Sequence, residues 1–180
     1  MRKVVSSLFM TLDGTVEDPS EWSFDSFDGD MFEAMGKALA AIDAVLMGRV
    51  TYQEWAPYWP ASVDEPYASF INGTTKYVAS TTLENVDAWK NSVLTRDLGA
   101  EVERLKASAG GDIGVQGSPS VVRWLIAHGL LDELTLMVYP VLAGGRKRLF
   151  GDDRTMKRLR LVDSKTTGSG VALLTYEPLR

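Results

Sequence analysis

Hydrophobic residues are distributed along the chain with two different periods. Short apolar runs bounded by turn residues predict buried strands over 3–10, 44–47, 76–80 and 112–117, with 92–95 as a further candidate. Between these runs, apolar residues recur at helical spacing, as at Met31, Met35, Leu39 and Ile42 in a helix expected over 30–42. The same reasoning predicts helices over 97–108 and 119–128. Alternating strands and helices favour a parallel sheet with helices on its faces.

The pattern changes after residue 130. Long strand candidates cover 133–142, 156–166 and 171–179, and the last two are joined across 167–170 as a predicted hairpin. The predicted fold is therefore an α/β domain with a mostly parallel central sheet, flanking helices and an antiparallel C-terminal hairpin at its edge. Because the chain has 180 residues and is 45% hydrophobic, residues 1–180 are expected to form a single domain.

Residues with capping chemistry predict where the helices begin. Ser118 and Pro119 are expected as the N-cap and first residue of one helix. Two pairs with the spacing of a capping box, Asp30 with Glu33 and Thr51 with Glu54, predict the starts of two earlier helices.

Composition and charge exclude several classes of function. A net charge of −5 gives no general basic field that would attract nucleic acid or an anionic membrane. The chain has no cysteine and a single histidine, His128, so no metal site is expected. The first residues lack a signal-peptide core, and no run approaches the roughly 20 apolar residues that cross a bilayer. We therefore expect a cytoplasmic protein.

One candidate binding site follows the apolar run at 44–47. Gly48 and Arg49 come directly after this predicted strand, and Thr51 lies at the start of the next predicted helix. In parallel α/β sheets, ligands bind beyond the carboxyl ends of strands, where helix N-termini attract anions. Arg49 could pair with a phosphate, and glycine allows close backbone approach. The alternative is a tight turn with Arg49 in a surface ion pair.

Two other predicted strands end in similar chemistry. Gly117 ends one strand before a helix that begins with small residues, although a simple strand-to-helix turn explains this equally well. The strand over 76–80 ends in Ser80, Thr81 and Thr82, whose hydroxyls could bind a phosphate or ribose but are also common in loops. Together the three strand ends suggest an extended phosphorylated ligand such as a dinucleotide, without the GxGxxG fingerprint.

Segments 7–18, 43–55, 76–83 and 112–150 resemble, in this order, the dihydrofolate reductase-like family, which includes the reductase (RibD C-terminal) domain of bacterial riboflavin biosynthesis. The most specific parts are "GLLDELTLMVYPVLAGG" at 129–145 and the Gly-Arg-x-Thr motif at 48–51. The resemblance implies a dihydrofolate reductase-like fold that binds NADPH. It implies that the cofactor pyrophosphate lies at Gly48, Arg49, Thr51, Gly117, Ser118, Pro119, Ser120 and Val121, with Ser80 and Thr81 near the adenosine ribose phosphate. Relatives often carry two or three glycines where this chain has Gly117, Ser118 and Pro119.

Asp13 and Trp22 are the candidate catalytic residues. Asp13 follows the first predicted strand and could handle a proton or anchor substrate, but an Asp-Gly turn explains it at least as well. Trp22 could cover the nicotinamide and stack on a flat substrate, or it could anchor a long loop.

These residues and the resemblance together predict the activity. The expected function is NADPH-dependent hydride transfer to a small planar heterocyclic or conjugated substrate, such as a pterin or a deaminated pyrimidine. The alternative is a nucleotide-binding dimeric module without chemistry. A homodimer is expected because strands 133–142 and 171–179 are too long and apolar to remain free edges or faces, unless the last hairpin covers itself in a monomer.

Overall fold

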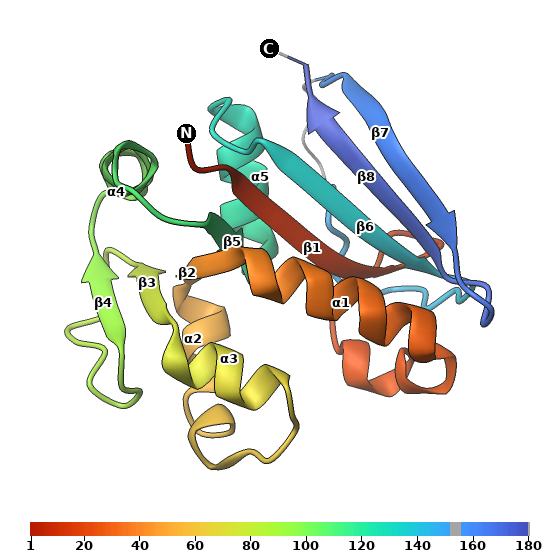
Figure 1. Ribbon diagram of the computed structural model, residues 1–180, viewed down its shortest axis with the longest axis horizontal. Coiled ribbons are helices and arrows are strands. Elements are labelled where there is room, and N and C mark those ends of the chain that lie inside the picture. Colours follow the sequence, from red (N-terminus) through yellow and green to blue (C-terminus); the bar gives the residue numbers. More distant parts are fainter. Residues whose placement is uncertain (152–155, 180) are drawn as a thin grey trace.

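The computed structural model describes residues 1–151 and 156–179. Helices and strands alternate through the first two thirds of the chain and give way to strands at its end (Figure 1). The strands are β1 (Val4–Thr11), β2 (Ile42–Gly48), β3 (Thr75–Ala79), β4 (Ser92–Thr95), β5 (Asp112–Val115), β6 (Glu133–Tyr139), β7 (Leu159–Thr166) and β8 (Ala172–Pro178). The α-helices are α1 (Gly29–Ala41), α2 (Arg49–Trp55), α3 (Tyr67–Gly73), α4 (Leu98–Ala107) and α5 (Pro119–Ala127). Short 3-10 helices occupy Pro19–Glu21, Phe24–Ser26 and Trp59–Ala61.

The strands form one eight-stranded sheet in the order β4-β3-β2-β5-β1-β6-β8-β7. Strands β1 to β6 pair in parallel, whereas β8 pairs antiparallel with both β6 and β7. This arrangement confirms the predicted α/β fold with an antiparallel C-terminal edge. It also places β6 and β8 inside the sheet, so the free edge at this end is β7 and not either of the two apolar strands named above.

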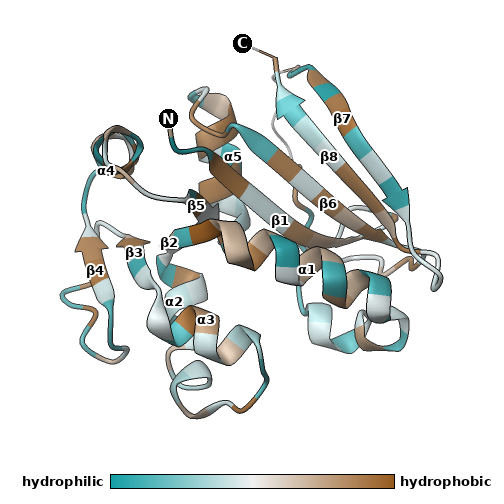
Figure 2. Ribbon diagram, viewed as in Figure 1, coloured by the Kyte–Doolittle hydropathy of each residue, from teal (hydrophilic) through white to brown (hydrophobic). Residues whose placement is uncertain are grey.

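Side chains alternate between the two faces of the sheet and bury a core on each. On one face, Val4, Leu46, Val115 and Leu134 pack with residues of α4 and α5. The other face carries two smaller cores, one around Tyr52 and Ile71 of α2 and α3, and one that includes Met31 of α1. In Figure 1, α1 and α3 cover this second face and α5 lies behind the sheet. Hydrophobic colouring is concentrated on the central strands, and β7 and α1 are mixed (Figure 2).

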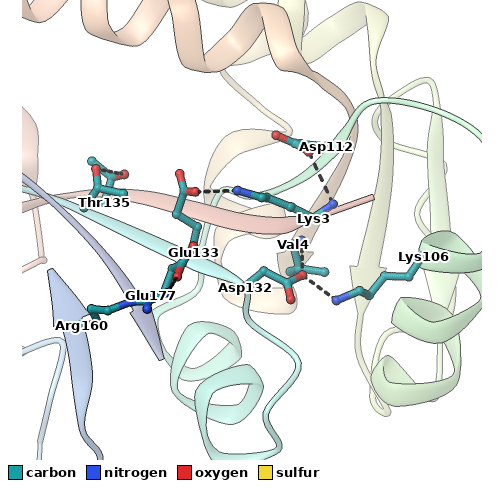
Figure 3. A network of polar contacts seen from close by, with 10 residues as sticks. Lys3, Val4, Lys106, Asp112, Asp132, Glu133, Thr135, Arg160 and Glu177 are labelled. Carbon is teal, nitrogen blue, oxygen red and sulfur yellow. Dashed lines mark hydrogen bonds and ion pairs between the residues drawn. The ribbon is translucent and has the colours of Figure 1, made fainter. Parts of the chain in front are cut away.

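Charged side chains fix the amino ends of the central strands. The carboxylate of Asp132 accepts hydrogen bonds from the backbone N–H of Val4 at 2.8 Å and from Lys106 Nζ at 2.5 Å, and Lys3 pairs with Glu133 at 3.2 Å (Figure 3). These contacts lie at the start of β1 and β6. The carboxyl ends of the parallel strands lie at the opposite end of the sheet, next to the helix N-termini.

Both predicted capping boxes are wrong. Helix α1 starts at Gly29, and its N-cap is Asp28, whose carboxylate accepts from the backbone N–H of Met31 at 3.0 Å. Helix α2 starts at Arg49, two residues before the predicted cap, so Thr51 lies inside the first turn. The hydroxyl of Thr51 is instead 3.1 Å from that of Ser118. A different local residue therefore caps α1, whereas in α2 a tertiary contact with Ser118 engages the Thr51 hydroxyl. Within 1–151 and 156–179, no helix is long and apolar enough to cross a membrane.

Candidate functional site

The candidate site lies where β2 and β5 end side by side. These parallel strands are neighbours, with Leu46 opposite Val115, and each is followed almost at once by a helix. Beyond the paired residues, the backbone N–H of Gly48 donates to the carbonyl of Gly117 at 3.1 Å. The N-termini of α2 and α5 therefore lie beside each other.

The two glycines allow these turns to touch. A Cβ atom at Gly48 would lie 2.6 Å from Ser118 Oγ, and one at Gly117 would lie 2.8 Å from Thr51 Oγ1. Gly117 also has a φ of +116°, a conformation that residues with side chains rarely adopt. The peptide bond that follows it, to Ser118, is cis. Both glycines are required by the packing of one turn against the other.

Polar side chains at the two turns divide into buried and exposed groups. Thr51 and Ser118 are buried, and their hydroxyl oxygens are 3.1 Å apart. Arg49 is exposed and donates from Nη1 to Gln53 Oε1 at 2.8 Å, one helical turn further along α2. The structure thus gives Thr51 and Ser118 a role in joining the turns, and it leaves the Arg49 guanidinium at the surface, where an anion can reach it.

The first turn of α5 determines which backbone groups can bind an anion. Ser118 is the N-cap as predicted, and Pro119 is the first helical residue, which has no N–H. The N–H of Val121 donates to the carbonyl of Ser118 at 2.9 Å and is already satisfied. Ser120 is exposed, and its N–H belongs to the group that has no intrahelical partner at a helix start.

The loop after β3 continues the same edge. The Ser80 hydroxyl oxygen accepts from the backbone N–H groups of Thr82 at 3.1 Å and Leu83 at 2.9 Å, which folds the loop into a tight turn. Thr81 is exposed at the tip of this turn.

Arg96 is a candidate binding residue that our sequence analysis missed. It follows β4 directly, and its guanidinium donates to the carbonyls of Ser80 at 3.0 Å and Leu83 at 2.6 Å. It therefore adds an exposed cation to the loop that carries Ser80 and Thr81. The strand-end rule applied above to β2, β3 and β5 would also have found it at the end of β4.

Asp13 holds two loops together. Its carboxylate accepts from the Thr11 hydroxyl at 2.5 Å and from the backbone N–H groups of Gly144 at 2.8 Å and Ala143 at 3.2 Å. The hydrogen bonds from Thr11 and Gly144 lower the pKa of Asp13 to about 2. Asp13 is therefore a carboxylate at neutral pH, a state that suits anchoring and does not suit proton donation.

Replacing Asp13 by Asn should change how thermal stability depends on acid. The folded-state pKa lies below the ordinary value of about 3.9, so the stabilising contribution of the carboxylate is present above that value and is lost as the pH falls through about 2. We expect the melting temperature of wild type to fall more steeply than that of Asp13→Asn between about pH 4 and pH 2. The matched control is Asp25→Asn, an exposed carboxylate. Parallel curves for wild type and Asp13→Asn would contradict this assignment.

Trp22 packs over an aromatic cluster at the ends of β1 and β6. Its ring centroid is 5.3 Å from that of Tyr139, edge to face, and Tyr139 in turn packs on Phe9. The indole N–H donates to the carbonyl of Glu17 at 3.0 Å. Trp22 is half-buried, so it anchors its loop and keeps part of its ring accessible. Burial raises the pKa of Tyr139 to about 12, and its hydroxyl has no partner among residues 1–151 and 156–179.

Solved structures of other proteins share this fold. The structure of a protein from Shewanella sp. PV-4 assigned to riboflavin biosynthesis matches with a TM-score of 0.80 at 20% identity, covering 99% of both chains. A pyrimidine reductase-like protein from Corynebacterium diphtheriae matches with a TM-score of 0.72 at 17% identity, over 99% of this chain and 92% of that one. Schistosoma mansoni dihydrofolate reductase matches with a TM-score of 0.62 at 12% identity, over 98% of both. The fold is thus dihydrofolate reductase-like, as predicted.

Sequence comparison identifies the family. The Bacillus subtilis (strain 168) uncharacterized protein YyaP is 32% identical over 97% of this chain and 94% of its own length. The RibD C-terminal domain family matches residues 2–173, which include every candidate site residue discussed above. The chain therefore belongs to the RibD C-terminal domain family, a family with a reductase-type fold.

Proposed function

We propose that this protein is an NADPH-dependent reductase that transfers hydride to a small planar heterocyclic or conjugated substrate, such as a pterin or a deaminated pyrimidine. One observation carries the proposal: groups able to bind an anion follow four consecutive strands of the sheet, β4, β3, β2 and β5. They are Arg96, Ser80 with Thr81, Arg49, and the start of α5 at Ser120. An extended ligand with phosphates at two places along its length fits such a row.

The chain's own residues fit the parts of NADPH in order. Arg49 and the backbone N–H of Ser120 at the start of α5 would hold the pyrophosphate, and the Gly48–Gly117 hydrogen bond keeps the two turns together. Ser80, Thr81 and Arg96 would hold the phosphate on the adenosine ribose, since hydroxyls and a guanidinium are its usual partners. When bound, the cofactor supplies the hydride. Thr51 and Ser118 act through each other as positioning residues, because their hydroxyls are buried together.

Residues at the ends of β1 and β6 would form the substrate side. Trp22 presents a half-buried indole whose accessible part can stack on a flat ring. Asp13 holds the loop at 143–144 against the turn after β1, and its ionised state favours this anchoring role over proton donation. Binding of a flat substrate here would exclude water from the reacting face and align it for hydride transfer.

The alternative is a nucleotide-binding module that has the same cofactor-binding groups at the ends of β4, β3, β2 and β5 but no productive substrate pocket. Both functions predict NADPH binding, and they differ in turnover. We expect NADPH oxidation, followed by its absorbance, with at least one member of a panel of pterins, deaminated pyrimidine ribosides and quinones. Binding of NADPH without turnover of any member would favour the module.

Arg49→Ala should weaken NADPH binding by about 1 to 3 kcal/mol, the range for loss of a charge-assisted hydrogen bond. Folding should be little affected, because Arg49 is exposed and contacts only Gln53 through its side chain among the described residues. Calorimetric titration measures the affinity, and Arg160→Ala, an exposed arginine on β7, is the control. If Arg49→Ala and Arg160→Ala bind NADPH equally, Arg49 is a surface residue without a role in the site.

We also propose that the protein is a cytoplasmic homodimer that pairs through its C-terminal strands. The support is the free edge of the sheet at β7, where seven of eight residues are exposed. Leu161 and Val162 on this edge are 50% and 43% exposed. A long edge strand with exposed apolar side chains favours association with a second copy.

A further inference from the structure

Gln116 lies between the candidate pyrophosphate site, at the turns after β2 and β5, and the helices α1 and α3. It follows β5, and its backbone N–H donates to the carbonyl of Leu46 at 3.0 Å. Because Ile113 and Val115 point into the core beneath α4 and α5, alternation along the strand directs Gln116 to the face that carries α1 and α3. Its neighbour Gly117 has no side chain that could separate the Gln116 side-chain amide from the candidate pyrophosphate site.

Tyr67, at the start of α3, fixes the orientation of this amide. Its hydroxyl donates to Gln116 Oε1 at 2.9 Å. The Tyr67 ring is itself held by Trp59, with centroids 4.7 Å apart, and by Trp55 at 6.1 Å. Burial raises the pKa of Tyr67, so the hydroxyl keeps its proton at physiological pH.

The other end of the amide is available to a ligand. With Oε1 engaged by Tyr67, the Nε2 group of Gln116 presents two N–H donors, and Nε2 has no partner among residues 1–151 and 156–179. Tyr67 and Gln116 thus form a preoriented donor directly beside the candidate cofactor site. An amide donor is complementary to a carbonyl oxygen, whereas a carboxylate at the same place would be complementary to a protonated amino edge.

We infer that Gln116 is a specificity-determining residue that donates a hydrogen bond from Nε2 to a ring carbonyl of the substrate, with Tyr67 as its positioning residue. This inference rests on the proposed function and narrows it to heterocycles with a carbonyl edge. The protein should therefore select a ring carbonyl over an amino edge at the position that faces β5.

The test compares two small probes, 6-aminouracil, which has ring carbonyls, and 2,4-diaminopyrimidine, which has amino edges. Dissociation constants are measured by calorimetry at saturating NADPH, so that changes in cofactor affinity do not enter. Wild type should bind 6-aminouracil about tenfold or more tightly than 2,4-diaminopyrimidine, and Gln116→Glu should reverse the order. Tyr67→Phe should bring the ratio toward one without reversing it, since the amide remains but is no longer oriented.

Lys157→Gln is the control for net charge, because it makes the same change of one unit at an exposed position before β7. It should leave the ratio of the two constants unchanged. An equal ratio in wild type and Gln116→Glu, or failure of the NADPH complex to bind either probe, would overturn the inference and leave NADPH binding intact. Failure of wild type to bind NADPH, titrated alone, would contradict the proposed function itself.

Discussion

Leu134→Asp should lower the free energy of unfolding of the protein by about 4 kcal/mol or more. Leu134 lies on β6, is 0% exposed and packs in the core beneath α5. A carboxylate there has no described partner and is too short to reach water, so the charge is either buried or the strand leaves the sheet. Because small domains have only about 5 to 15 kcal/mol of stability, a loss of this size removes a large part of it. Urea denaturation followed by circular dichroism measures the loss.

The matched control is Leu161→Asp, the same substitution on a strand that the sequence also predicts. Leu161 is 50% exposed at the edge of the sheet, and its replacement should change the free energy of unfolding of the single chain, measured at a protein concentration below that at which the proposed dimer forms, by less than about 1 kcal/mol. Similar losses in the two variants would contradict the observed burial of β6 and exposure of β7.

The same control variant addresses the proposed homodimer. Light scattering of wild type at micromolar concentration should give about twice the mass of one chain, and Leu161→Asp should shift the mass toward that of a monomer. A wild-type mass equal to that of one chain would contradict the dimer. A dimer that is unaffected by Leu161→Asp would contradict pairing through β7.

Gly117→Val should destabilise the fold by about 3 kcal/mol and also prevent NADPH binding. The φ of +116° is strained for any residue with a side chain, and a Cβ atom would approach Thr51 Oγ1 to 2.8 Å. Thr51 is buried and hydrogen-bonded to Ser118, so it cannot move away without separating the two turns. Thermal melts with and without NADPH should show a lower melting temperature and no increase on addition of the cofactor.

Gly36→Val is the control for this substitution. Gly36 lies in α1, its φ is negative, and a Cβ atom there would have nothing within 4 Å. Its stability should stay within about 0.5 kcal/mol of wild type, and NADPH should still raise its melting temperature. Unchanged stability in Gly117→Val would show that the turns after β2 and β5 are not packed against each other.

The sheet could largely be predicted from the sequence because its strands are short apolar runs bounded by turn residues. The runs at 44–47 and 112–117 correspond to β2 and β5, and the change of pattern after residue 130 marks the antiparallel end. The strand-end rule also placed Gly48 and Gly117 at the same edge of the sheet, since the carboxyl ends of parallel strands share that edge, but it did not predict that β2 and β5 are neighbours. Apolar runs and turn residues can be recognised in the sequence because they do not depend on which distant segment a strand packs against.

Features that depend on contacts between segments far apart in the sequence could not be predicted. The Thr51 hydroxyl looked like a helix cap, but its partner is Ser118, 67 residues away. The order of the strands was not predicted, so strands 133–142 and 171–179 were expected to need a second copy to cover them, whereas β6 and β8 lie inside the sheet and β7 is its edge. Arg96 and Gln116 belong to no sequence motif. They become candidate binding residues only because the fold places Arg96 beside Ser80 and Gln116 beside Tyr67.

A crystal structure of the protein with NADPH tests the central claim most directly. We predict that the pyrophosphate lies between Arg49 and the N-terminus of α5, that the phosphate on the adenosine ribose lies near Ser80, Thr81 and Arg96, and that the nicotinamide points toward the ends of β1 and β6. A cofactor bound elsewhere on the chain, or crystals soaked at saturating NADPH that show none at the ends of β2 and β5, would contradict the proposed reductase.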